Sequence, residues 1–266
     1  MSRALRRAYI AALVLFLSAP LIVVLGVSLN AKKQLLFPPR GTSLRWYAEL
    51  FGDDAWLGAV ANSLVIALAS ALVALSIALP LAYFLWRYRV RYARALFALG
   101  VAPFLLPPVI TALGFLIFWA TLGFYGQFPA VVISHGIFFV TLPLVTLSLG
   151  FEAIDPALVE AAETLGADRR QVFRTVILPL VRPYMVSGYA FAFVLSLNEY
   201  IVAYMVAGFT VETLPIKIFN SLRYGYTPVM AVVAVLFAVL AALIFGLVGR
   251  FGNLPRLLGA LGPGEK

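Results

Sequence analysis

A stretch without Asp, Glu, Lys or Arg extends from Ala95 to Phe151, and it limits the possible folds of this chain more than any other feature. Its 57 residues would form roughly 86 Å of α-helix, nearly three times the hydrocarbon thickness of a bilayer, which is about 30 Å. Gly123, Gly126 and Pro129 lie near its middle, where helix-breaking residues predict a turn. The stretch therefore predicts two membrane crossings joined by a turn.

Four further runs are each long enough to cross a bilayer, and Glu199 is the only charged residue inside them. They are Ala8–Leu29, Ala55–Trp86, Tyr184–Phe209 and Thr227–Gly249. Hydrophobic residues make up 63% of the sequence and charged residues 12%, against about half and about a quarter in soluble domains. The excess apolar surface must face lipid, so we expect an all-α membrane protein with six transmembrane helices in a single domain, residues 1–266.

Basic residues indicate the orientation of these helices. With the N-terminus inside, fourteen Lys and Arg residues fall in inside segments and six in outside segments, as the positive-inside rule requires. Both termini are therefore expected in the cytoplasm. The net charge of +9 does not indicate nucleic-acid binding, because the charges cluster at the ends of apolar runs. The first run is longer than the apolar region of a signal peptide, so we expect a retained helix and not a cleaved leader.

The inside loop of residues 152–182, between the fourth and fifth helices, has the sequence pattern of folded structure. Asp155 is a good N-cap, Pro156 a good first helical residue and Gly166 a good terminator. One apolar face is expected on this short helix, formed by Leu158, Ala161, Ala162 and Leu165. A second amphipathic segment follows, with Val172, Phe173, Val176 and Ile177 on one side, and Pro179 is expected to break it.

A helix of two turns is not stable alone in water, so this one must pack against something. One possibility is its own membrane domain or the lipid interface. The other is a cytoplasmic partner, which the acidic character of the helix favours, because interfacial helices usually carry a basic face.

The loop also carries a specific motif. Glu160-Ala161-Ala162, then Gly166, then Leu178-Pro179 resembles the EAA loop of permeases in ATP-driven (ABC-type) importers, with Val176 where that family usually has Ile. The resemblance implies a type I importer permease in the bacterial inner membrane. It also implies that Asp155, Glu160, Ala161, Ala162, Gly166, Leu178 and Pro179 couple it to an ATPase.

The same resemblance implies several partners besides membrane lipid: an ATP-binding-cassette ATPase dimer, a second permease subunit, and a periplasmic or lipid-anchored substrate-binding protein. The segment Thr213–Phe219, followed by Tyr224-Gly225 and Pro228, resembles the spermidine/putrescine branch. That branch implies a small cationic or zwitterionic, polyamine- or amino-acid-like solute.

The sequence contains no phosphate-binding P-loop and no catalytic motif. We therefore expect a non-catalytic subunit without a metal or cofactor of its own, with ATP and Mg²⁺ bound by the partner ATPase.

Glu199 is the second informative feature, because a charge near the bilayer centre costs about 2.5–3.5 kcal/mol and usually faces a cavity or a partner. It is either structural or part of a solute pathway. The candidate pathway residues are Glu199, Asn198, Tyr200, Tyr204 and His135, the only histidine. The rival function is a secondary transporter or channel that needs no ATPase; its internal repeats or multiple intramembrane charges are not apparent in this sequence.

Overall fold

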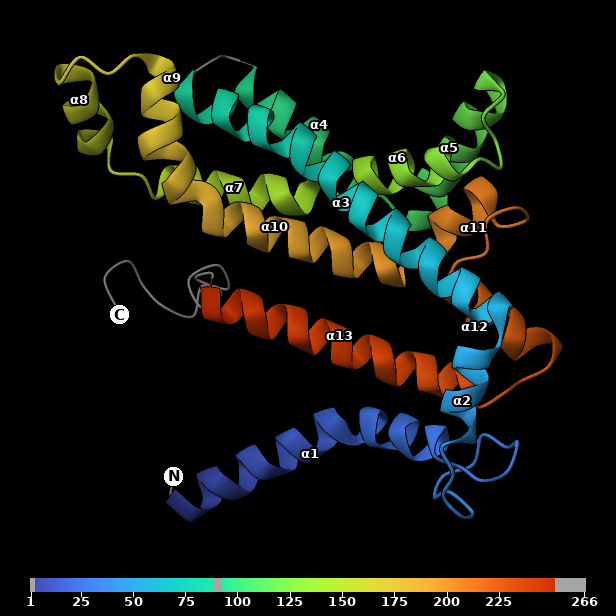
Figure 1. Ribbon diagram of the computed structural model, residues 1–266. Coiled ribbons are helices and arrows are strands. Elements are labelled where there is room, and N and C mark those ends of the chain that lie inside the picture. The colour runs from blue at the N-terminus through green and yellow to red at the C-terminus, as the bar shows by residue number, and fades with distance from the viewer. Residues whose placement is uncertain (1–2, 89–91, 252–266) are drawn as a thin grey trace. The chain divides into compact units, whose positions relative to one another are not determined.

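The computed structural model describes residues 3–88 and 92–251, and the part of the chain that it describes is almost entirely helical (Figure 1). Three long helices match predicted crossings: α1 (Arg3–Ser28), α3 (Asp54–Arg87) and α13 (Val229–Phe251). Within the described residues, four helices are long and apolar enough to cross a membrane, and the count is six if two bent pairs are each one span. The predicted six-helix, all-α architecture is therefore consistent with the structure.

The two bent pairs occupy the long uncharged stretch. α4 (Ala93–Leu105) and α5 (Pro108–Leu122) meet at 102°, and α6 (Phe128–Phe138) and α7 (Thr141–Glu152) meet at 41°. The larger bend lies at Pro107, whose ring removes a backbone donor and disfavours a helical conformation in the residue before it. The predicted turn between the pairs is confirmed, with Gly123 and Gly126 in the left-handed region at φ 75° and 79°.

The contacts of the chain gather in two compact units. The first comprises residues 1–60 and 217–242 and contains α1, α2 (Arg45–Gly52), the start of α3, most of α12 (Leu214–Tyr224) and the start of α13. Here the indole nitrogen of Trp46 donates to the carbonyl of Asn30 at 2.6 Å. The ammonium of Lys217 lies 5.2 Å from the ring centre of Trp56. These contacts connect helix ends that are far apart in sequence.

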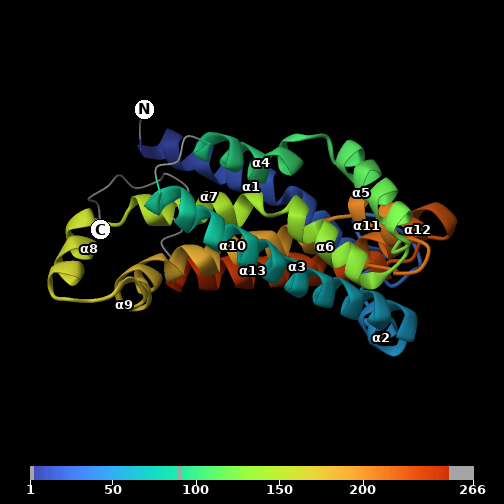
Figure 2. The same ribbon diagram turned by 90° about the horizontal axis from the view of Figure 1, so that it is seen from above.

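The second unit, residues 61–216 and 243–266, contains both candidate sites. Its most extensive packing joins α7 to α10 (Leu178–Asn198), two helices that lie side by side in Figures 1 and 2. Gly188 permits this approach, because a Cβ there would lie 2.6 Å from the Cα of Pro143. In both views α8 (Pro156–Thr164) and α9 (Arg169–Val172) lie at one end of this unit, and α5 and α11 (Ile201–Ala207) lie at the other.

Two expectations for the fifth crossing were wrong. Pro179 does not end the second loop segment, because α9, the π-helical segment η1 (Phe173–Ile177) and α10 form one helix over Arg169–Asn198. A π turn, in which the backbone N–H of Leu178 donates to the carbonyl of Phe173, precedes this proline inside the continuous helix. Glu199 is not inside a helix either: α10 ends at Asn198 and α11 begins at Ile201.

Candidate functional site

The short helix α8 is built by three local signals that the sequence predicted. The carboxylate of Asp155 accepts a hydrogen bond from the backbone N–H of Ala157 at 2.9 Å, which satisfies a donor that the first turn leaves unpaired. Pro156 is the first helical residue. Gly166 follows the helix at φ +88°, a conformation that L side chains rarely adopt. The predicted N-cap and terminator are therefore confirmed.

One side of α8 is fixed to the rest of the unit by a small apolar side chain. Val159 is buried in a core cluster with Phe151, Ile154, Val172 and Ile177. Ala162, one turn further on, packs against the same cluster. From α3, Tyr83 contributes an edge-on contact with Phe173 at 5.1 Å between ring centres, and Trp86 stacks on Phe151 at 5.5 Å. The inward face of α8 thus packs on α9 and η1, in a cluster that also contains residues of α3 and α7.

The opposite side of α8 faces outward, and it carries three of the four residues of the predicted apolar face. Of the four residues expected to share it, only Ala162 turns inward, whereas Leu158 is 48% exposed, Leu165 is 88% exposed and Ala161 is exposed. Glu160 is exposed on the flank of that surface. Val159, which the periodicity argument omitted, is the true anchor. The outward surface is apolar and acidic, and it remains uncovered by the described part of this chain.

An ion pair that sequence reasoning missed lies beside this anchor. A guanidinium nitrogen of Arg87, the last residue of α3, lies 2.9 Å from a carboxylate oxygen of Glu163. Both side chains are about one-third to two-fifths exposed. Glu160 and Glu163 therefore differ in role: Glu163 is engaged inside the chain, and Glu160 points outward. The only sequence signal was opposite charge on two inside segments, which does not specify a pairing.

The last two motif residues lie at the start of α10. Leu178 packs against the same core cluster as Val159, and Pro179 is exposed. The motif residues therefore lie in two places: on α8, whose outward surface is exposed, and at the start of α10.

The second candidate site is the break between α10 and α11. Glu199 lies in this break, and its carboxylate accepts from the backbone N–H groups of Val202 at 2.8 Å and Ala203 at 3.0 Å. These groups are unpaired donors of the first turn of α11, so Glu199 caps that helix. The break thus has a local cause in a side chain that competes with helix continuation.

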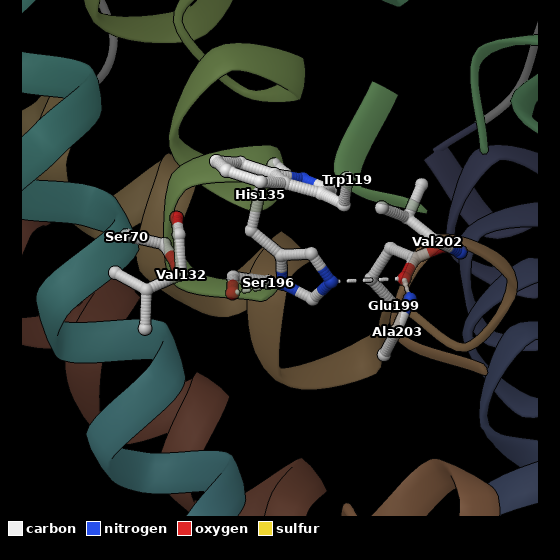
Figure 3. A network of polar contacts seen from close by, with 9 residues as sticks. Ser70, Trp119, Val132, His135, Ser196, Glu199, Val202 and Ala203 are labelled. Carbon is white, nitrogen blue, oxygen red and sulfur yellow. Dashed lines mark hydrogen bonds and ion pairs between the residues drawn. The ribbon is translucent and has the colours of Figure 1, made fainter. Parts of the chain in front are cut away.

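The same carboxylate meets the only histidine of the sequence, on α6. The Nε2 atom of His135 lies 3.0 Å from Oε2 of Glu199, and its Nδ1 atom lies 2.8 Å from the hydroxyl of Ser196. Figure 3 shows the imidazole between these two groups, with Trp119 beside it. The indole of Trp119 donates to the hydroxyl of Ser134 at 2.8 Å. The side chains of His135 and Glu199 are 1% and 8% exposed.

The other three predicted pathway residues lie around this pair. Asn198 is exposed and donates back to the carbonyl of Val194 at 2.8 Å. Tyr200 and Tyr204 are partly buried and stack with ring centres 5.3 Å apart. Four of the five predicted residues thus lie near the α10–α11 break because they are close in sequence, and the contact with His135 of α6 is the part that the structure adds. No cluster of three or more His, Cys, Asp or Glu side chains with metal-ligand geometry occurs within residues 3–88 and 92–251.

Comparison with known proteins gives close relatives. The chain is 34% identical to the putrescine transport system permease protein PotI of Escherichia coli strain K12 over 244 residues, covering 89% of this chain and 84% of that protein. It is 30% identical to the spermidine/putrescine transport system permease protein PotC of Haemophilus influenzae over 237 residues, covering 89% and 92%.

Among solved structures, the chain resembles a subunit of a bacterial ABC transporter involved in the import of the acidic polysaccharide alginate. The TM-score is 0.71 at 17% identity, and the match covers 94% of this chain and 98% of that one. The likeness establishes a shared fold. Residues 74–253 match the family described as the inner membrane component of binding-protein-dependent transport systems. This chain, a multi-pass membrane protein with the fold of importer permeases, belongs to that family.

Proposed function

We propose that this chain forms part of the translocation path of an ATP-driven importer in a bacterial inner membrane and is moved by a separate ATPase that docks on α8. Both termini would lie on the ATPase side. ATP and Mg²⁺ would be held by the ATPase, since this sequence has no P-loop.

The observation that carries this proposal is the outward surface of α8. Leu158, Ala161 and Leu165 present an exposed apolar strip with Glu160 beside it, on a helix whose other face is fixed by Val159. A nine-residue helix gains little stability by itself, so an exposed apolar strip on it favours burial against a partner. The small side chain of Ala161 permits close approach, and Glu160 offers a carboxylate to basic groups of the ATPase.

The solute proposed for this importer is small and cationic or zwitterionic. PotI and PotC are named as putrescine and spermidine/putrescine permeases, and they match most of this chain. Asn198, Tyr200 and Tyr204 are the residues proposed to line the solute path. Asn198, Tyr200 and Tyr204 are partly or fully exposed, whereas His135 and Glu199 are engaged with each other.

The partners follow the same reasoning. A second permease of related sequence would complete the path, and a substrate-binding protein outside the membrane would deliver the solute. The family description itself names binding-protein dependence.

The test is uptake by the complete complex in liposomes, with radiolabelled putrescine, glycine and succinate as cationic, zwitterionic and anionic probes. We expect uptake of putrescine or glycine that depends on ATP inside. Glu160→Lys should reduce uptake at least about ten-fold, because it reverses an exposed charge on the docking surface. Glu152→Lys makes the same charge change at an exposed residue at the end of α7, and should retain activity.

Uptake that proceeds without ATP would favour the secondary transporter or channel. Uptake of succinate alone would overturn the solute class. Equal activity of Glu160→Lys and the wild type would exclude α8 as the docking surface.

A further inference from the structure

The carboxylate of Glu199 is already occupied by groups of its own chain. It lies within 3.0 Å of three donors, namely the N–H groups of Val202 and Ala203 and the imidazole of His135. A carboxylate has about four acceptor positions, and the side chain is only 8% exposed. A solute ammonium group would therefore find about one acceptor position left on this carboxylate, on a side chain that is almost entirely buried.

His135 is fixed on both sides of its ring. The Nε2 atom lies 3.0 Å from Glu199, and the Nδ1 atom lies 2.8 Å from the hydroxyl of Ser196. Phe139 packs edge-on to the ring at 5.8 Å between centres. The imidazole therefore has one orientation, and that orientation determines where the carboxylate lies.

The pair connects both sides of the α10–α11 break to α6. Ser196 is in the last turn of α10, and Glu199 caps α11, so one imidazole on α6 contacts the structure before and after the break (Figure 3). A second connection holds α11 from its other end, where the N–H of Gly126, in the α5–α6 turn, donates to the carbonyl of Val206 at 3.0 Å. α11 is thus held against α5 and α6 at both ends.

We propose that His135 and Glu199 form an internal ion pair that fixes α11 beyond the break, and that Glu199 is a positioning residue rather than the acid that meets a cationic solute. The solute part of this inference rests on the proposed function. The pairing itself does not, and it can be measured without any solute.

Buried ion pairs give a distinctive mutational pattern. Removing one member leaves the other buried without its partner, whereas replacing both with neutral groups avoids that cost. Single changes at His135 and Glu199 should therefore be severe and strongly non-additive, whereas a carboxylate waiting for a solute would show no coupling to His135.

The experiment is a double-mutant cycle on the full complex with Glu199→Gln, His135→Gln and the double variant. Thermal unfolding and the kinetics of putrescine-stimulated ATP hydrolysis are both measured. We expect each single change to lower the melting temperature by about 6 °C or more, and the double variant to lower it no further than the worse single change. Maximal rate should fall in the single variants, with the KM for putrescine changed less than about two-fold.

A further variant separates charge from position. Glu199→Asp keeps the negative charge but shortens the side chain by one methylene, so it cannot satisfy His135 and α11 together. It should lower the melting temperature and the maximal rate without raising KM. If a single variant does not fold, a folded double variant demonstrates the coupling by itself.

Additive shifts in melting temperature would overturn the pairing. A KM for putrescine raised ten-fold or more by Glu199→Gln, but unchanged by His135→Gln and Glu199→Asp, would show that Glu199 meets the solute. If putrescine stimulates no hydrolysis even in the wild type, the proposed solute fails, and the thermal cycle still decides the pairing.

Discussion

The ion pair between Arg87 and Glu163 gives a prediction whose size follows from its geometry. At 2.9 Å the attraction between two unit charges is about 1.4 kcal/mol in water and about 6 kcal/mol at an effective dielectric constant of 20. Both side chains are more than one-third exposed, so the net contribution should fall near ~0.2–1 kcal/mol. Reversing one charge replaces this attraction with repulsion of similar size. The free energy that holds α8 in its seated position should therefore fall by a total of about 0.4–2 kcal/mol. This corresponds to a factor of about two to thirty in the population of the seated helix.

The assay for this pair is the ratio of putrescine uptake to ATP hydrolysis by the reconstituted complex. Arg87→Glu and Glu163→Arg should each lower that ratio several-fold, because a loosely seated α8 transmits less motion to α3 and α10. The charge-swapped double variant should recover most of the ratio, and the defects of the single variants should shrink in high salt. A swap that is no better than the worse single variant would refute the reasoning, as would single variants that behave like the wild type.

Three further changes test the construction of the second unit. Asp155→Ala removes the cap of α8 and should destabilise this helix by about 0.5–2 kcal/mol. The loss should be measured as faster proteolysis or hydrogen exchange of residues 155–166. Asp155→Asn, which keeps a capping oxygen, should behave nearly as the wild type. Gly166→Ala places a Cβ on a residue in the left-handed region and should destabilise the end of α8 by about 1–2 kcal/mol in the same assay. The control is Gly52→Ala, at a helical position with open space around it, which should not destabilise the chain. Gly188→Ala places a Cβ 2.6 Å from the backbone of Pro143 and should lower the melting temperature of the complex by several degrees, and an unchanged melting temperature would contradict the close packing of α7 and α10.

Features with local causes were predictable from the sequence. The N-cap at Asp155, the first helical residue Pro156 and the terminator Gly166 each act within a few residues, and the structure has α8 where these signals place it. Most of the crossings were accessible in the same way, because long apolar runs have few alternatives in a membrane, whereas the fifth helix begins and ends earlier than its apolar run.

Features that depend on tertiary contact were not predictable. Val159 anchors α8 because it is buried in a cluster with residues of α3, α7, α9 and η1, and helical periodicity alone did not indicate that this residue would face inward. His135 and Glu199 are 64 positions apart in the sequence, and nothing local indicates that they meet. Two local features were also missed, because Glu is not among the usual N-cap residues and proline usually marks a helix boundary: the helix break at Glu199 and the π turn before Pro179.

The contact between α8 and an ATPase is the central claim, and cross-linking tests it most directly. The sequence has no cysteine, so a single cysteine introduced at Ala161, on the outward face, can be labelled with benzophenone maleimide without background in this chain. Photolysis of the complete complex should yield a covalent adduct with the ATPase, and Val159→Cys, on the buried face, should yield far less. An Ala161→Cys complex that forms no ATPase adduct, or no more than Val159→Cys forms, would contradict the docking of an ATPase on this helix.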